Sequence, residues 1–204
     1  MDIFDYDESH RAAADCGLIA GIDEAGRGPI AGPVVAAAVI LPKGFKIPRL
    51  RDSKLVPEKE RRELFIAVIS SAIDFAVGIA HTEIIERINI LNATKHAMSE
   101  AVKGLSESPA LLLIDAVKLS SVGIKQVSLI KGESKSASIA AASIIAKYVR
   151  DCMMYHYHRI YPQYGFDRHK GYCTEEHMKN VALYGPCPIH RRGFNKVCNL
   201  ELPF

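Results

Sequence analysis

The sequence predicts an α/β fold built as one main domain. Short apolar runs typical of buried strands alternate with longer stretches of helical periodicity, in the order strand, strand, helix, strand, helix, strand. The chain has 204 residues, of which 49% are hydrophobic, so it can bury a substantial core, and its length is about that of one ordinary domain. These observations favour a sheet with helices packed against it.

The first two strands are expected at residues 18–26 and 34–42. The segment LIAGIDEAG has apolar residues on both sides of two adjacent acids. The segment VVAAAVILP is rich in small and β-branched residues and is closed by Pro42, which is typical of a buried strand. Together the two segments predict a hairpin or a pair of adjacent strands.

Two amphipathic helices are expected next. Residues 52–73 have apolar side chains at helical spacing, with Ser53 as the expected cap. Residues 83–105 have the same character, and this second helix is expected to break near Asn92 and to end at Gly104. A strand-like segment, DFAVGIAHT, separates the two helices.

The next strand, residues 110–119, is almost wholly apolar and contains Asp115, which is typical of a central strand with an acid at its carboxyl end. Residues 125–134 add a further short strand. An Ala-rich helix is then expected over residues 136–162, with Ser138 as its cap. The segment after it alternates Gly/Pro turns with one short helix.

Charge is distributed unevenly along the chain. The net charge is +3, but residues 118–204 hold 13 Lys and Arg against 6 Asp and Glu. This basic part favours a polyanionic partner, with an ordinary solvated surface as the alternative. The five cysteines include no CxxC pair and are expected to be free thiols.

A cytoplasmic protein without membrane contact is expected. No apolar run reaches the roughly 18 residues that a membrane helix needs. Residues 1–15 are acidic and polar, whereas a secretory signal is basic and then apolar.

Several acids lie within or next to apolar or small-residue segments, and these are Asp23, Glu24, Asp115, Glu133 and Asp151. Any one of them could pair with a lysine or cap a helix. A buried carboxylate without compensation is costly, so a group of them favours a bound cation. Carboxylate oxygens suit Mg²⁺ or Mn²⁺, and a pair of such ions can stabilise both the attacking and the leaving oxygen of a phosphodiester.

Helix geometry separates the last two of these acids. If the helix begins near Ser138, Asp151 lies roughly 20 Å along its axis from the end that carries Glu133. One compact site cannot include both. Glu133 is therefore assigned to the site, and Asp151 is expected to be structural.

Six blocks of sequence together resemble type 2 ribonuclease H, the bacterial ribonuclease HII family. They are GIDEAGRGPIAGPVVAAAVILP, DSKLV, LLLIDAVKL, KGESKSASIAAASIIAKYVRD, YPQYGFDRHKGY and GPCPIHRRGF. The blocks occur in the family's order at compatible spacing, from about residue 18 to residue 197. The resemblance implies an RNase H-like mixed sheet flanked by helices, with a C-terminal helical extension.

The resemblance also implies a division of the chain. Residues 1–17 are expected to form a polar lead-in, residues 18–155 an RNase H-like catalytic core, and residues 156–204 a basic extension packed on that core. All three are expected to belong to a single domain, and the protein is expected to be a monomer. The C-terminal segment NLELPF is a candidate for contact with a sliding clamp.

By resemblance, Asp23, Glu24 and Asp115 match the family's first three metal ligands. Glu133 lies where the family has its fourth acid. Most ribonucleases HII resemble the sequence KGD at this position, with an aspartate, and glutamate is more typical of ribonuclease HIII. The chain is too short for the extra N-terminal domain of that sister family, so the ribonuclease HII expectation is kept. The glutamate leaves open the geometry and the preferred ion of the second metal position.

The resemblance assigns recognition of an RNA–DNA junction to Gly26, Arg27, Gly28 and Tyr172. Glycines let the backbone approach a sugar closely, and backbone amides can donate to a 2′-hydroxyl, the group that distinguishes RNA from DNA. The Tyr172 ring is expected to pack on the deoxyribose that follows the ribonucleotide. Candidates for phosphate contacts, with a solvated surface as the alternative, are Lys54, Arg191 and Arg192.

The implied activity is endonucleolytic cleavage of the RNA strand in RNA–DNA hybrids, and of duplex DNA on the 5′ side of single embedded ribonucleotides. Two ions of Mg²⁺ or Mn²⁺ are expected, with water attacking in line and with 5′-phosphate and 3′-hydroxyl products. Two alternatives stay open: another two-metal nuclease or strand-transfer enzyme of the same fold, and a non-catalytic nucleic-acid binding module.

Overall fold

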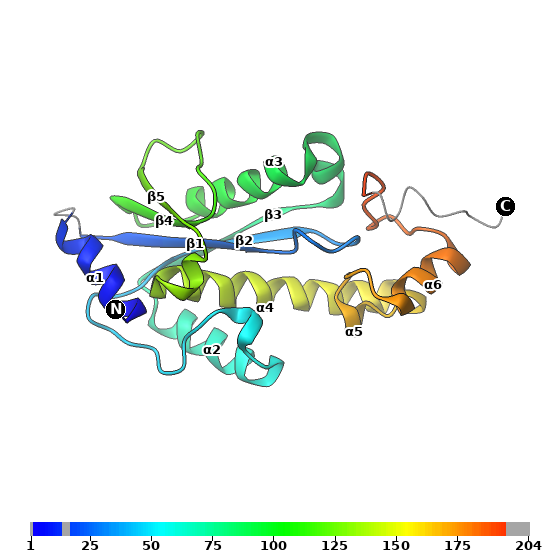
Figure 1. Ribbon diagram of the computed structural model, residues 1–204, viewed down its shortest axis with the longest axis horizontal. Helices are drawn as coiled ribbons and strands as arrows, with labels where there is room; N and C mark the ends of the chain where they lie inside the picture. Colours follow the sequence, from blue (N-terminus) through cyan, green and yellow to red (C-terminus); the bar gives the residue numbers. More distant parts are fainter. Residues whose placement is uncertain (1, 14–16, 195–204) are drawn as a thin grey trace.

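The computed structural model describes residues 2–13 and 17–194 and confirms an α/β fold with a mixed sheet in the order β3-β2-β1-β4-β5 (Figure 1). The strands are β1 (Ile19–Ala25), β2 (Val34–Ile40), β3 (Asp74–Ala80), β4 (Leu111–Asp115) and β5 (Lys125–Leu129). The α-helices are α1 (Ile3–Ala13), α2 (Glu58–Ser71), α3 (Thr82–Lys103), α4 (Ala137–Ile160), α5 (Phe166–His169) and α6 (Glu175–Tyr184). Short 3-10 helices are η1 (Ser53–Leu55), η2 (Gly132–Ser134) and η3 (Pro162–Tyr164).

β1 is the central strand of the sheet. It pairs antiparallel with β2, as the two apolar runs predict, and parallel with β4, where Ile22 lies opposite Ile114. Because β1 and β4 run in the same direction, their carboxyl ends lie at one edge of the sheet. Asp23 and Asp115 each follow that last pair by one residue, so the topology places them side by side.

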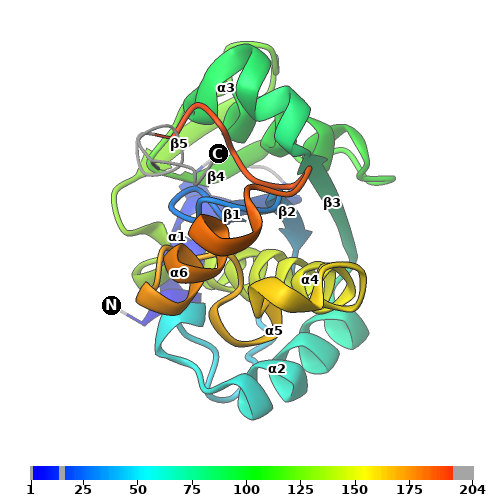
Figure 2. The same cartoon turned by 90° about the vertical axis from the view of Figure 1, so that its right-hand side faces the viewer.

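Helices cover both faces of the sheet, with α3 on one face and α4 and α2 on the other (Figure 1 and Figure 2). Alternate residues of β2 enter the two cores: Ala36 and Ala38 pack with α3, whereas Ala37 packs with α4. α4 crosses β1 closely, since a Cβ on Gly21 would lie 2.0 Å from the carbonyl carbon of Ser138. Small residues on β1, β2 and α4 permit this approach.

Two helices begin later or earlier than predicted. α2 begins at Glu58, after Pro57, and the residues near Ser53 form the separate helix η1. Proline disfavours helical backbone in the residue before it, so a helix cannot run continuously from Ser53 through Pro57. α4 is capped by Ser136, whose side chain accepts from the Ile139 amide, and the predicted cap Ser138 is wrong.

The break in α3 lies at Asn89 and not at Asn92. Asn89 has φ 66° and ψ 167°, and asparagine adopts a positive φ more readily than most residues. Gly104 caps the end of α3, which confirms the predicted boundary.

Helix α1 was not predicted, because residues 3–13 have no clear apolar periodicity. Its anchor is Asp7, whose Oδ2 accepts from the amide and the hydroxyl of Ser138 at 2.8 and 2.7 Å. Burial raises the pKa of Asp7, and its bonds to the serines oppose that effect. The N-terminal helix therefore helps to hold the beginning of α4 in place.

Helices α5 and α6 form the C-terminal extension, which lies at the far end of α4 from η2 (Figure 1). Its small core includes Tyr164 and Phe166, whose rings stack with centroids 5.4 Å apart. Within the described residues, every helix is too short or too polar to cross a bilayer.

Candidate active site

Three acids gather at the sheet edge where β1 and β4 end. Oxygen atoms of Asp23, Glu24 and Asp115 all lie within 4.8 Å of one another. The Glu24 amide donates to Oδ1 of Asp23 at 2.8 Å, and the amide of Gly132 donates to Oδ1 of Asp115 at 2.7 Å. These backbone donors fix the orientation of two of the three carboxylates.

Burial and mutual repulsion perturb the three acids. Burial raises the pKa of Asp23 well above its usual value, and the charges of Glu24 and Asp115 raise it further. Burial also raises the pKa of Glu24 against the opposing effect of Arg27, and that of Asp115 against the hydrogen bond from Gly132. The acids therefore resist sharing this edge as carboxylates unless a cation joins them.

Glu133, the fourth predicted acid, lies on η2 beside Asp115 and is 6% exposed. Its Oε1 accepts from Nζ of Lys54 at 3.2 Å, and the charge of Glu133 raises the pKa of Asp115. Burial acts to raise the pKa of Glu133, but its own backbone amide and Lys54 outweigh burial and lower that pKa. The structure thus brings Glu133 and the predicted phosphate ligand Lys54 together next to the three acids.

The residues present fit a divalent cation. Oε2 of Glu24 and Oε2 of Glu133 are buried and have no hydrogen-bond partner among the residues that the structure describes. A buried carboxylate oxygen without a partner is costly, and a hard cation is the partner that such oxygens suit. The four acids can therefore hold Mg²⁺ or Mn²⁺, with Asp23, Glu24 and Asp115 as one group and Glu133 beside it.

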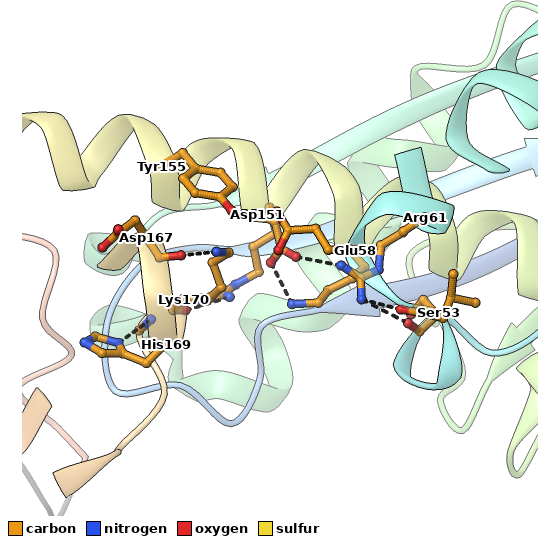
Figure 3. Close-up of polar contacts among 12 residues, drawn as sticks. Ser53, Glu58, Arg61, Asp151, Tyr155, Asp167, His169 and Lys170 are labelled. Atoms are coloured by element: carbon orange, nitrogen blue, oxygen red, sulfur yellow. Dashed lines mark hydrogen bonds and ion pairs between the residues drawn. The ribbon is translucent and has the colours of Figure 1, made fainter. Parts of the chain in front are cut away.

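Asp151 lies apart from the four acids, which confirms its predicted structural role. Figure 3 shows Arg61 between Asp151 and Ser53. Asp151 accepts from Arg61 at 3.1 Å and from Lys147 at 2.6 Å. Arg61 also donates to the carbonyl of Val56 at 2.8 Å, so this buried group ties the segment that carries Lys54 to α4.

Gly26, Arg27 and Gly28 form a loop directly after β1, named here the GRG loop. Gly26 has φ 102°, which side chains rarely allow, and a Cβ there would lie 2.2 Å from Nε of Arg150. Nη1 of Arg27 pairs with Oε1 of Glu24 at 3.3 Å, so the loop adjoins the acids. Within the described part of the chain, the amides of Arg27 and Gly28 have no hydrogen-bond partner.

Two buried arginines hold the GRG loop and the residues that follow it. Arg191 is 0% exposed, and all five of its N–H groups donate to main-chain carbonyls at 2.6–3.0 Å. These carbonyls belong to Gly26, Arg27, Pro29 and Gly32. Arg150 donates to the carbonyls of Ala31, Pro33 and Lys170. The phosphate contact predicted for Arg191 is therefore wrong, because its guanidinium is buried and fully used by the backbone.

Tyr172 lies beside the GRG loop. The residue is 46% exposed, and a Cβ on Gly28 would lie 3.8 Å from Cε1 of the Tyr172 ring. The carbonyl of Gly171 accepts from the amide of Ile30 at 3.0 Å, which joins the two segments. The structure thus brings together the residues that the sequence assigned to one recognition surface.

The remaining predicted residues lie at the edge of this region or beyond the described chain. Arg192 is exposed, and its amide donates to Oε1 of Glu86 on α3 at 2.8 Å. The clamp-binding segment predicted at residues 199–204 lies outside the residues that the structure describes.

Sequence reasoning missed the groups that support the site. Arg150 is one, although a cation among the mainly apolar buried residues of α4 was a signal for it. His177 and His190, which are buried in the extension, were not singled out either. Their position between Gly/Pro turns carried no recognisable pattern.

Comparisons with known proteins agree on one family. The family model described as Ribonuclease HII matches residues 20–197. A protein named Ribonuclease HII from Caldanaerobacter subterraneus subsp. tengcongensis is 52% identical over 177 residues, which is 87% of this chain and 73% of that protein.

Solved structures of ribonucleases share the fold of this chain. The crystal structure of the ribonuclease H2 from Pyrococcus horikoshii OT3 has a TM-score of 0.74 and 26% identity, and the match covers 90% of this chain and 97% of that one. The structure of the PCNA:RNase HII complex from Archaeoglobus fulgidus has a TM-score of 0.71 and 24% identity, and the match covers 87% and 95%. The second likeness supports the fold alone.

Proposed function

The chain belongs to the ribonuclease HII family, and on that basis we propose that it cuts duplex DNA at single embedded ribonucleotides by a two-metal mechanism. Family membership makes the protein a metal-dependent ribonuclease H that hydrolyses the RNA of RNA–DNA hybrids. The observation that carries the finer proposal is the placement of Tyr172 against the GRG loop, beside the acids.

The acids hold the ions in this proposal. Asp23, Glu24, Asp115 and Glu133 would hold Mg²⁺ or Mn²⁺ through their carboxylate oxygens, and the bound ions would supply the Lewis-acid chemistry needed to activate water and to stabilise the leaving 3′ oxygen. Lys54 neutralises Glu133 in the free protein, and its exposed ammonium can contact the phosphate of a bound strand. One chain carries all four acids, so a monomer suffices for this site.

The GRG loop and Tyr172 select the position of the cut. The unpaired amides of Arg27 and Gly28 face no competing acceptor in the described protein and can donate to the 2′-hydroxyl of a ribose. The Tyr172 ring packs on the next sugar, where a 2′-hydroxyl would clash. This arrangement favours a ribose followed by a deoxyribose, cut on its 5′ side to leave 5′-phosphate and 3′-hydroxyl ends.

Three labelled duplexes test the proposal: one with a single ribonucleotide, one with four consecutive ribonucleotides, and one of DNA alone. With Mg²⁺ or Mn²⁺, the protein should cut the first on the 5′ side of the ribonucleotide and leave the third intact. Cleavage confined to the four-ribonucleotide duplex would contradict junction recognition and leave the metal site standing.

The Tyr172→Ala substitution tests the ring itself. Base–aromatic stacking contributes about 1–3 kcal/mol in single-strand complexes, and as a rough analogue its loss should slow cleavage of the single-ribonucleotide duplex ten-fold or more. Tyr172→Phe keeps the ring and should stay close to the wild type. Equal rates for all three proteins would remove Tyr172 from the proposal.

Contact with a sliding clamp through residues 199–204 belongs to the same proposal. An archaeal RNase HII forms a complex with PCNA, and the segment NLELPF offers apolar side chains for such a contact. Deletion of residues 199–204 should abolish binding to the clamp of the same organism in surface plasmon resonance, with cleavage of a free duplex unchanged. Unchanged clamp binding would refute the contact.

A further inference from the structure

The C-terminal extension contains a connected pair of buried histidines. His177 on α6 and His190 are 0% and 1% exposed, and their Nε2 atoms lie 3.0 Å apart. Nδ1 of His190 is 2.9 Å from the amide nitrogen of Cys187, and Nδ1 of His177 is 2.8 Å from the carbonyl oxygen of Tyr172. The pair thus bridges the turn at Cys187 and the loop that carries Tyr172.

The contacts determine which ring nitrogens carry protons. Nδ1 of His190 lies 2.9 Å from the Cys187 amide, which can only donate, and 3.3 Å from the Cys187 carbonyl, which can only accept. The shorter contact assigns Nδ1 as the acceptor and places the proton of neutral His190 on Nε2. That N–H donates to Nε2 of His177, whose own proton must then be on Nδ1. Nδ1–H of His177 donates to the Tyr172 carbonyl, which can only accept. All the hydrogen bonds of this series are therefore donated in one direction, starting at the Cys187 amide and ending at the Tyr172 carbonyl.

The same histidines join the two halves of the recognition surface. His190 forms an isolated β-bridge with Ala31, and the residues on either side of His190 bond to the chain that follows the GRG loop. The amide of Gly32 donates to the carbonyl of Ile189, and the amide of Arg191 donates to the carbonyl of Ile30, both at 2.8 Å. The other main-chain bonds of Tyr172 are local, to His169 and Thr174.

We propose that His177 and His190 are positioning residues that hold Tyr172 against the GRG loop and thereby set the preference for a ribose followed by a deoxyribose. The inference rests on the proposed function of Tyr172. Neither histidine touches the substrate in this proposal. Their contribution is the hydrogen bond to the Tyr172 carbonyl and the connection from that bond to the segment beside Ala31.

The surroundings keep both rings neutral. Rings of Phe166 and Tyr164 pack edge-on against His177 and His190 respectively, and His169 stacks on His177 with centroids 4.2 Å apart. The ionisable groups that act on the pair are His169 on α5, Glu176 on α6, Cys187 and Tyr164. Burial lowers the pKa of His177 and of His190 to about 4. A second proton would place two N–H groups opposite each other, so the connection exists only in the neutral form.

Two substitutions of His177 separate its two hydrogen bonds. His177→Asn places an amide nitrogen near the position of Nδ1 and keeps the bond to Tyr172, whereas His177→Gln reaches His190 but has no donor at that position. The readout is the ratio of kcat/KM on the single-ribonucleotide duplex to that on the four-ribonucleotide duplex. His177→Gln should lower this ratio about ten-fold, the effect of one lost hydrogen bond, and His177→Asn should lower it about two-fold or less.

A general loss of folding lowers both rates and leaves the ratio unchanged, so the ratio isolates positioning. The proposal is overturned if both variants keep the wild-type ratio while Tyr172→Ala lowers it, or if His177→Asn lowers the ratio as much as His177→Gln. Thermal melting verifies that each variant is folded at the assay temperature.

Nitrogen NMR of the wild-type protein tests the histidine pair independently of activity. Two-bond ¹⁵N–¹H correlations at pH 7 should show His177 protonated on Nδ1 and His190 protonated on Nε2. The opposite tautomers, or a charged ring, would overturn the positioning role whatever the variants do. If Tyr172→Ala leaves the ratio unchanged, the proposed function of Tyr172 fails, and the observed tautomers then decide whether the histidine connection exists.

Discussion

The acid cluster (Asp23, Glu24, Asp115 and Glu133) and the arginine pair beneath the GRG loop (Arg150 and Arg191) each bring buried or half-buried groups of like charge close together. The acid cluster contains four carboxylates, and two of their buried oxygens have no hydrogen-bond partner in the described chain. The arginine pair contains Arg150 and Arg191, and within the described residues their guanidinium groups donate to main-chain carbonyls and not to carboxylates. Burial lowers the pKa of Arg191 to about 9 and that of Arg150 to about 10, as it raises the pKa of Asp23.

The two regions differ in what the charged groups still need. Every N–H group of Arg191 donates to a main-chain carbonyl, so no N–H group is left to bind a ligand. The carboxylates retain free oxygens that only a further partner can satisfy. Burial of charge therefore does not identify a ligand site by itself. A ligand site is identified by buried polar atoms that still lack a hydrogen-bond or coordination partner. This property distinguishes the acid cluster from the arginine pair that supports the GRG loop.

The largest expected effect follows from neutralising one carboxylate of the acid cluster. Asp23→Asn or Asp115→Asn should slow cleavage roughly a thousand-fold or more, because each metal ion contributes several kcal/mol to the transition state. Duplex affinity in a gel-shift assay should change little, because the acids bind metal ions and do not contact the strand directly. The exposed acid Glu107, changed to Gln, is the control and should keep full activity. Substantial turnover by either aspartate variant would contradict the assignment.

Three acids of the cluster could be predicted from sequence because they stand at the ends of apolar strand-like runs, whereas Glu133 lies on η2. Asp23 and Asp115 end apolar runs, and parallel strands place their carboxyl ends at one edge. The arginine pair could not be predicted, because the bond from Arg191 to the Gly26 carbonyl joins residues 165 apart in the chain. The sequence shows that Arg191 is charged but not that it is buried, and the same ambiguity produced the wrong phosphate contact. Helix α1 was missed for a related reason, since its anchor at Ser138 is 131 residues away from Asp7.

The second prediction tests the arginine pair by stability. Arg191→Met removes the donor for the carbonyls of Gly26, Arg27, Pro29 and Gly32 and should lower the free energy of unfolding by about 3–5 kcal/mol. Arg191→Lys should recover little of this loss, because an ammonium cannot reproduce the planar fork. Urea unfolding measures both values. The same change at the exposed Arg159 of α4 should cost less than about 1 kcal/mol. Equal losses at the two positions would contradict the distinction drawn here.

The third prediction uses pH and metal. The pKa of Asp23 is higher in the folded than in the unfolded chain, so the folded protein binds more protons and loses stability as pH rises through that interval. In metal-free buffer, Asp23→Asn should therefore gain stability relative to the wild type as pH rises above about 4. Saturating Mg²⁺ or Mn²⁺ should stabilise the wild type by about 2.7 kcal/mol at one hundred times Kd, and the variant by less. If the difference in stability between Asp23→Asn and the wild type did not depend on pH, repulsion between Asp23 and the neighbouring acids would be absent.

The smallest expected effect concerns Lys54, the exposed cation that joins the acid region in the free protein. Its ion pair with Glu133 is open to water on the lysine side, so Lys54→Met should change the free energy of unfolding by less than about 1 kcal/mol.

Lys54→Met should raise the affinity for Mn²⁺, whereas substitutions of the acids should lower it. Lys54 competes with an ion for the carboxylate of Glu133, and its removal should tighten Mn²⁺ binding a few-fold, as one weak surface pair of about 0.5 kcal/mol predicts. Isothermal titration of Mn²⁺ measures this, and Lys135→Met, on an exposed lysine just beyond η2, is the control. If Lys54 also contacts the phosphate, kcat/KM for the duplex should fall although the metal binds more tightly. Weaker Mn²⁺ binding in Lys54→Met would show that the lysine supports the acid cluster as the arginines support the GRG loop.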